Sequence, residues 1–135
     1  MNYLLDTHVW LWAECTPERI PTGILRKLAD EEASLWLSPV SLWEAAVLAE
    51  RGRIRARGPR RETLLAMYTG GRWVEAPLTG DVALASRDLD LSTQDPADRF
   101  IAATALVNGL TLVTADGRLV SARGIDVLAF RPRPA

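Results

Sequence analysis

The chain has 135 residues, of which 48% are hydrophobic and 24% are charged, a composition typical of a folded globular domain. Its one cysteine, Cys15, excludes an internal disulfide framework, and the sequence shows neither a signal peptide nor an apolar run of roughly 20 residues. We therefore expect one soluble, cytoplasmic domain over residues 1–135, with no membrane partner. The formal net charge of −1, taken alone, argues against a general nucleic-acid binder.

The charges are unevenly distributed along the chain. Six arginines and no acid fall between residues 51 and 61; they are Arg51, Arg53, Arg55, Arg57, Arg60 and Arg61. Without these six, the formal charge would change from −1 to −7. A solvated loop is one interpretation of this arginine segment, and a phosphate-contacting edge or a docking site for an acidic partner is the other.

The first half of the chain predicts two short buried strands, each followed by a helix. Residues 2–5 and 34–38 are predicted strands, and helices are predicted over residues 8–13, 21–32 and 39–51. Pro21 is expected as the first residue of its helix, and Ser38 as the cap of the third helix. Gly52 is expected to end that helix before the arginine segment.

The second half repeats this alternation. Helices are predicted over residues 60–69, 80–88 and 96–108, with a short one after Gly117, and strands over 72–76, 110–114 and 126–130. Thr79 and Asp95 are expected to cap two of these helices. Alternating strands and helices predict an α/β/α sandwich around a mostly parallel sheet of about five strands.

Four acids fall where strands end or where the following helices begin. They are Asp6, Glu44, Asp98 and Asp116. In an open parallel sheet these places meet at one edge, so we expect the four carboxylates to lie close together. Each also has a local explanation: a strand-end turn for Asp6, an ion pair with Arg51 for Glu44, the helix dipole for Asp98, and a turn or cap for Asp116.

Clustered carboxylates raise one another's pKa unless a cation compensates their charge. All-oxygen ligands suit Mg²⁺ or Mn²⁺, and one cysteine and one histidine are too few for a zinc site. A carboxylate-held Mg²⁺ or Mn²⁺ leaves positions for water and phosphate oxygens, which suits phosphoryl transfer. The sequence therefore predicts a divalent metal site at this edge of the sheet.

Four motifs carry these acids: Leu-Leu-Asp6-Thr-His-Val-Trp-Leu-Trp, Ser-Leu-Trp-Glu44-Ala-Ala, Asp95-Pro-Ala-Asp98-Arg-Phe-Ile-Ala-Ala-Thr-Ala and Leu-Val-Thr-Ala-Asp116. Together they resemble the PIN-domain ribonucleases, and more narrowly the VapC toxins of toxin–antitoxin pairs. Their order and spacing cover nearly the whole chain, except for residues 51–80.

The resemblance implies that Asp6, Glu44, Asp98 and Asp116 bind Mg²⁺ or Mn²⁺ and support RNA cleavage by a metal-activated water. It also implies a VapB-like antitoxin that blocks the site, and a homodimer. Thr7 and Thr114 match positions where such proteins often carry a hydroxyl near the metal.

Other side chains near these motifs have two interpretations each. Arg99 either contacts a phosphate or, as we favour, pairs with a nearby acid. His8 is expected to support the site rather than to act as a base. Trp10, Trp12, Trp36 and Trp43 either stack on RNA bases or, more commonly for tryptophan, fill the core or an interface.

Two other functions remain compatible with parts of the sequence. A haloacid-dehalogenase-type phosphatase also begins with a strand-end aspartate, but it needs a second one two residues later, where this chain has His8. A catalytically silent module with the PIN fold would act only through a binding partner. The complete set of four acids favours the nuclease over both.

Overall fold

The computed structural model describes residues 1–55 and 58–134, so Arg57 of the arginine segment lies outside the described residues. Five strands form one parallel sheet in the order β3-β2-β1-β4-β5. They are β1 (Asn2–Leu5), β2 (Ser34–Leu37), β3 (Trp73–Glu75), β4 (Thr111–Thr114) and β5 (Val127–Ala129). The predicted parallel α/β sheet of five strands is confirmed.

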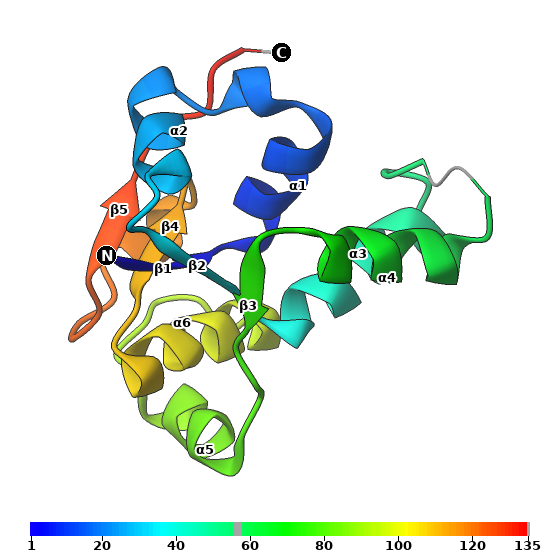
Figure 1. The fold of residues 1–135 in the computed structure, drawn as a ribbon. Coiled ribbons are helices and arrows are strands. Elements are labelled where there is room, and N and C mark those ends of the chain that lie inside the picture. Colours follow the sequence, from blue (N-terminus) through cyan, green and yellow to red (C-terminus); the bar gives the residue numbers. More distant parts are fainter. Residues whose placement is uncertain (56–57, 135) are drawn as a thin grey trace.

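Seven α-helices and one short 3-10 helix connect the strands in the part of the chain that the structure describes. They are α1 (Thr7–Cys15), η1 (Pro17–Arg19), α2 (Thr22–Ala29), α3 (Pro39–Glu50), α4 (Arg60–Gly70), α5 (Gly80–Asp88), α6 (Pro96–Asn108) and α7 (Gly117–Val120). In Figure 1, α1 and α2 lie on one side of the sheet, and α5 and α6 lie on the other.

The alternation of side chains along β1 explains this layering. Successive residues of a strand point to opposite faces. Tyr3 and Leu5 accordingly pack in one core with residues of α1, α2 and α4, whereas Leu4 packs in a second core built largely on α6. Both faces of the central strand are therefore buried, as expected for a parallel sheet between two layers of helices.

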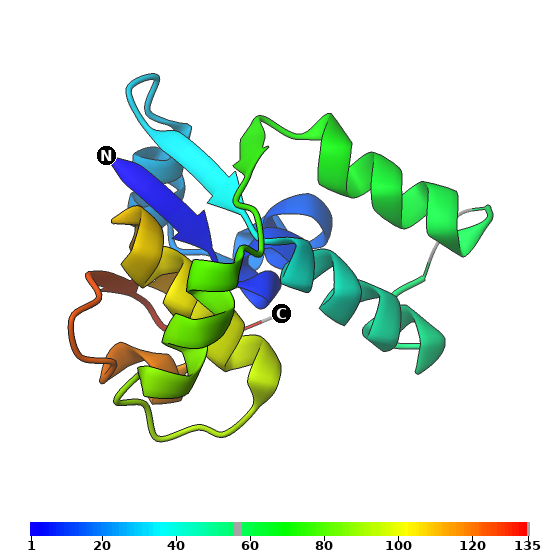
Figure 2. The same cartoon turned by 90° about the horizontal axis from the view of Figure 1, so that it is seen from below.

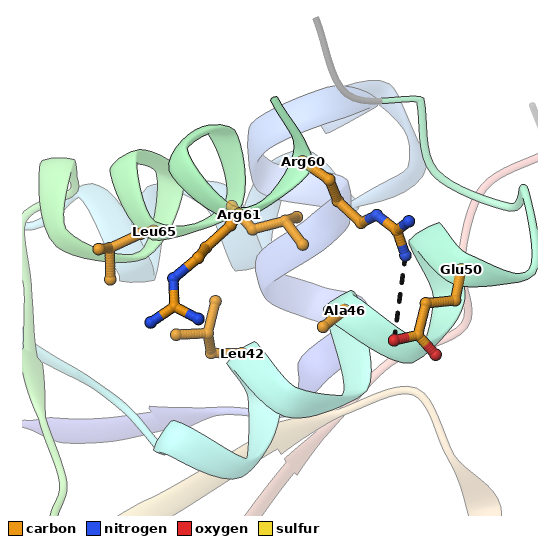
Figure 3. Close-up of a pocket in the computed structure, with 7 residues that line it drawn as sticks. Leu42, Ala46, Glu50, Arg60, Arg61 and Leu65 are labelled. Atoms are coloured by element: carbon orange, nitrogen blue, oxygen red, sulfur yellow. Dashed lines mark ion pairs between the residues drawn. The ribbon is translucent and has the colours of Figure 1, made fainter. Parts of the chain in front are cut away.

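Helices α3 and α4 extend together beyond the sheet, as Figure 2 shows. Between them lies a groove of about 560 Å³ with Leu42 and Ala46 on the α3 side and Arg61 and Leu65 on the α4 side (Figure 3). An exposed ion pair of 3.9 Å joins Arg60 and Glu50 at its outer end. The arginine segment connects the outer ends of these two helices.

The predicted caps place the helices that carry the acids. Ser38 accepts a hydrogen bond from the Val40 amide at the start of α3 (3.1 Å), and Asp95 accepts one from the Ala97 amide at the start of α6 (3.0 Å). Thr79 caps α5 in the same way, through the Val82 amide (3.3 Å). These three predictions are confirmed.

The predicted helix over residues 21–32 is wrong at both ends. Pro21 is the cap rather than the first helical residue, and the helix ends at Ala29. Asp30 has an extended ψ of 133°, and its carboxylate accepts a hydrogen bond from the Glu32 amide (2.9 Å). This local turn competes with another turn of helix, as aspartate often does.

Candidate active site

The four predicted acids come from four elements at the carboxyl edge of the sheet. Asp6 follows β1, Asp116 follows β4 by two residues, Glu44 lies on α3 and Asp98 lies in the first turn of α6. We call these four residues the acidic rim. Their mutual proximity is visible in their electrostatics, since the charges of Asp6 and Asp98 both raise the pKa of Glu44.

Asp6 is the most firmly held of the four. One carboxylate oxygen accepts a hydrogen bond from the Thr7 amide (2.8 Å), and the other accepts one from the Thr114 hydroxyl (2.7 Å). The first bond makes Asp6 the cap of α1, a role that the sequence did not predict. Burial raises the pKa of Asp6, while the two hydrogen bonds oppose this rise.

The hydroxyl groups of Thr7 and Thr114 donate hydrogen bonds to carboxylates of the rim. The Thr7 hydroxyl donates to Glu44 Oε1 (2.5 Å) and lies 2.9 Å from the Ser41 hydroxyl. The Thr114 hydroxyl donates to Asp6 and accepts a hydrogen bond from the Asp116 amide (3.0 Å). Both threonines are fully buried, so the resemblance correctly located hydroxyls beside the acids. Glu44 faces Thr7 and does not pair with Arg51, its alternative from the sequence.

The carboxyl groups of Glu44 and Asp98 both have a raised pKa in the folded protein. Burial, then the charges of Asp6, Asp98 and Asp95, raises the pKa of Glu44 to about 7. Burial, followed by the neighbouring charges of Asp95 and Asp6, raises the pKa of Asp98 to about 6. Like charges that share a site produce this effect when they lack a compensating cation.

Asp116 differs from Glu44 and Asp98 in that its pKa is lowered, because Arg118 pairs with its carboxylate. Arg118 donates to both carboxylate oxygens of Asp116, from Nε (3.2 Å) and from a terminal nitrogen (2.8 Å). These hydrogen bonds lower the pKa of Asp116. The same terminal nitrogen lies 3.3 Å from Asp98 Oδ2, so one guanidinium bridges two members of the rim.

The donor set of the rim fits a hard divalent cation. Its ligand atoms are carboxylate oxygens, two of which are anchored by hydroxyls, and a cationic group already lies between two of its members. Among residues 1–55 and 58–134, no three His, Cys, Asp or Glu side chains converge as they would around a bound ion.

Arg99 has a different role from both of those predicted. It is buried, and its guanidinium donates to backbone carbonyls of residues 86–93; they are Ser86 (2.8 Å), Leu89 (2.9 Å), Thr93 (3.0 Å), Leu91 (3.2 Å) and Arg87 (3.5 Å). The predicted acidic partner is replaced by main-chain oxygens, since the loop before α6 folds around this side chain. Arg99 thus positions α6, and Asp98 with it, without facing the rim.

The sequence missed Thr93 and Arg118, which contact the rim, and Ser41, which contacts Thr7 beside it. Ser41 lies three residues before Glu44 on the same helix, and that spacing was a usable signal. Thr93 lies 3.4 Å from Asp98 Oδ2, and Arg118 bridges Asp98 and Asp116. Nothing in the sequence around Thr93 or Arg118 distinguishes them from ordinary turn residues.

The four tryptophans named from the sequence occupy different environments. Trp10 is fully buried and packs edge-on against Tyr68 and Trp73, so it belongs to the core. Trp12 lies under Arg19, whose guanidinium is 4.9 Å from the ring centre, and Trp36 is partly buried in the second core. Trp43 is 61% exposed and lines an apolar groove of about 530 Å³ with Leu78 and Phe100.

The fold and the rim define a class of protein: a parallel α/β domain with carboxylates collected at the carboxyl edge of its sheet. Residues 3–125 match the PIN domain family. The chain is 37% identical over 134 residues to Ribonuclease VapC22 of Mycobacterium tuberculosis, covering 97% of this chain and 94% of that protein. The chain therefore belongs to the PIN domain family.

Solved structures share the fold at lower identity. The toxin–antitoxin complex VapBC2 of Rickettsia felis, bound to a promoter DNA fragment, matches with a TM-score of 0.71 and 17% identity, over 96% of this chain and 99% of that chain. DNA-bound VapBC of Salmonella typhimurium matches with a TM-score of 0.67 and 20% identity, over 96% and 98%. No helix within the described residues has the length and apolar character to span a membrane.

Proposed function

We propose that this protein is a VapC-type toxin, an endoribonuclease that hydrolyses RNA phosphodiester bonds with the help of a divalent metal ion. The acidic rim is the observation that carries the proposal: four carboxylates lie at one edge of the sheet, and burial together with neighbouring acids raises the pKa of Glu44 and of Asp98. The 37% identity to Ribonuclease VapC22 over almost the entire chain supports RNA as the substrate.

Asp6, Glu44, Asp98 and Asp116 would hold the metal ion, which we expect to be Mg²⁺ or Mn²⁺. When bound, such an ion lowers the pKa of a water molecule and stabilises the charge that develops on the phosphoryl oxygens. The chain's own contribution is to orient the ligands. Thr114 fixes one oxygen of Asp6, and Thr7 fixes one oxygen of Glu44. Fixed ligands bind with a smaller loss of side-chain entropy.

The partners follow from the same comparison. The similar complexes contain VapB with VapC, so we propose a VapB-like antitoxin that covers the acidic rim, and a homodimer as the assembly. Because RNA is the proposed substrate and an antitoxin the proposed inhibitor, we also propose that the protein acts in the cytoplasm. We further propose that residues 1–135 act as one PIN domain.

The two other candidate functions are disfavoured by particular residues. A haloacid-dehalogenase-type phosphatase needs an acid at the position of His8. A silent binding module gains nothing from a set of four rim acids, of which three have a pKa raised by burial.

Incubation of the purified chain with transcribed RNAs tests the proposal. We expect cleavage with Mg²⁺ or Mn²⁺, none with excess chelator, and a rate reduced more than about 100-fold in Asp6→Asn. Asparagine retains an oxygen for the Thr7 amide and supplies a donor for the Thr114 hydroxyl, so the variant should fold. Equal cleavage by the variant, or cleavage that persists in chelator, would contradict the proposal.

A further inference from the structure

Arg118 lies at the acidic rim, outside the set of residues that the family motifs identify. Its guanidinium donates to Asp116 at 2.8 and 3.2 Å and lies 3.3 Å from Asp98 Oδ2. In the part of the chain that the structure describes, the ion pairs that reach the rim are both made by this one side chain. It is thus a cation supplied by the protein itself to an otherwise anionic site.

Arg118 and a divalent ion would compete for the same atoms. A metal held by Asp98 and Asp116 needs lone pairs on the oxygens to which the guanidinium donates. A carboxylate oxygen committed to two N–H donors is a poorer ligand, and two cations a few ångströms apart repel one another. Arg118 therefore has to move before both carboxylates can ligate an ion.

The structure also shows why Arg118 can move without disturbing the fold. Its side chain is 57% exposed, and it extends from α7, a helix of only four residues. The carboxylates are more firmly placed: the side chain of Asp98 is 9% exposed, and the Asp116 amide is bonded to Thr114. The exposed arginine is the mobile member of this contact, and the acids are its fixed members.

We propose that Arg118 is an internal counter-cation, which occupies the rim in the metal-free protein and is displaced by the divalent ion. It thereby raises the metal concentration at which the site fills. This inference rests on the proposed function, since it requires that the rim binds a metal. It assigns Arg118 the role of a positioning residue that acts through Asp98 and Asp116.

Calorimetric titration of the metal-free full chain with Mn²⁺ at pH 8, without RNA, tests the inference. We expect Arg118→Gln to bind Mn²⁺ about fivefold more tightly than the unsubstituted chain, because the ion pairs of Arg118 with the two carboxylates no longer have to be broken. Arg118→Lys, which keeps the charge but loses the two-pronged geometry, should lie between them. Arg123→Gln is the matched control: it removes the same charge five residues away, where Arg123 pairs with exposed Asp90.

The possible results separate this inference from the proposed function. Affinity for Mn²⁺ in Arg118→Gln that equals that of Arg123→Gln, or falls below that of the unsubstituted chain, overturns the inference while the metal site stands. A fall would mean that Arg118 orients Asp116 for the metal. Absence of Mn²⁺ binding in all of these proteins would contradict the metal site itself, and the inference with it.

Discussion

The four rim carboxylates have similar chemistry but differ in how their charge is compensated. Arg118 neutralises Asp116, and hydrogen bonds from Thr7 and Thr114 partly stabilise Asp6. Glu44 has one hydroxyl donor, and burial together with three acidic neighbours raises the pKa of its carboxyl to about 7. Its protonation should therefore be the easiest to detect in the metal-free protein.

Glu44→Gln should stabilise the metal-free protein by about 1 kcal/mol at pH 8 and have little effect near pH 4.5. The expected gain at pH 8 is small because the carboxyl group of Glu44 is partly exposed to solvent. The pKa of Glu44 rises from its ordinary 4.5 to about 7 on folding, so the folded state binds more protons between these values. Stability conferred by the protonated carboxyl is thus lost as the pH rises through 7.

Urea unfolding of both proteins at pH 4.5 and pH 8 measures this difference. Glu31→Gln, in an exposed turn, is the control for a general effect of removing one negative charge. A pH-independent difference between Glu44→Gln and the unsubstituted chain would show that folding does not raise the pKa of Glu44.

Arg99→Met should destabilise the protein by about 3 kcal/mol, since several buried carbonyls lose their charged donor. Arg99→Lys should recover only part of this loss, because an ammonium group cannot reach carbonyls on so many sides as a guanidinium. Thermal unfolding followed by circular dichroism checks both variants. A loss below about 0.5 kcal/mol in Arg99→Met would contradict the role assigned to this residue.

At the scale of residues, the sequence predicted the four acids and the two threonines that contact them, but not Arg118, which contacts Asp98 and Asp116. The rim was predictable because parallel strands bring their carboxyl ends together, whatever the details of packing. Arg99 was misjudged because its partners are main-chain carbonyls of a loop whose path the sequence does not specify. Arg118 was missed because its contact with Asp98 spans two elements.

The joint between α4 and β3 depends on a close approach at Gly71. A Cβ added there would lie 2.0 Å from the ring of Trp73, which packs against Trp10 in the core. Gly71→Ala should therefore cost about 1–3 kcal/mol by displacing the ring. At Gly70, the last residue of α4, a Cβ would meet nothing within 4 Å, so Gly70→Ala is the matched control.

Denaturation and near-ultraviolet circular dichroism of the two glycine variants compare them directly. We expect a lower midpoint and an altered tryptophan signal for Gly71→Ala, and neither change for Gly70→Ala. Equal stability of the two variants would contradict the packing described for Trp73.

At the scale of elements, the strands and the helices that begin at a capping residue were predictable, whereas helix ends without a sequence signal were not. The starts of three helices were predictable because a side-chain oxygen at the cap position accepts a hydrogen bond from one of the first free amides. The cap residues are Ser38, Thr79 and Asp95. The early end of α2 was not predictable, since Asp30 could continue the helix or, as the structure has it, form a turn. The short helix η1 was also missed, as its three residues have no periodic pattern.

At the scale of the whole molecule, a net charge of −1 is the sum of +6 on the arginine segment and −7 on the rest of the chain, which includes the four acids of the rim. The acidic rim lies at the edge of the sheet, and the arginine segment lies at the outer ends of α3 and α4. Arg53 and Arg55 line a groove of about 480 Å³ that also reaches His8, two residues from Asp6. In this groove, RNA phosphates or the acidic groups of a partner protein would meet the positive charges of Arg53 and Arg55.

Replacing Arg53 and Arg55 together with glutamine should weaken RNA binding and reduce the slope of log affinity against log salt by about 1.4, if each arginine contacts one phosphate. Filter binding of RNA to chains that also carry Asp6→Asn, at several salt concentrations, measures both quantities. Replacement of the exposed Arg26 and Arg123 is the charge-matched control. An unchanged slope would remove RNA from the functions of this segment and leave a docking site for an acidic partner or a solvated loop.

The central claim is that the four carboxylates act together as a metal site that cleaves RNA. Its most direct test is the initial rate of cleavage of one defined RNA by the chelated protein, measured as Mn²⁺ is added back, for the unsubstituted chain and for Asp98→Asn. We predict that activity returns with Mn²⁺ only in the unsubstituted chain, while both proteins show the same circular dichroism spectrum. Recovery of the full rate in Asp98→Asn, or activity before Mn²⁺ is added, would contradict the account.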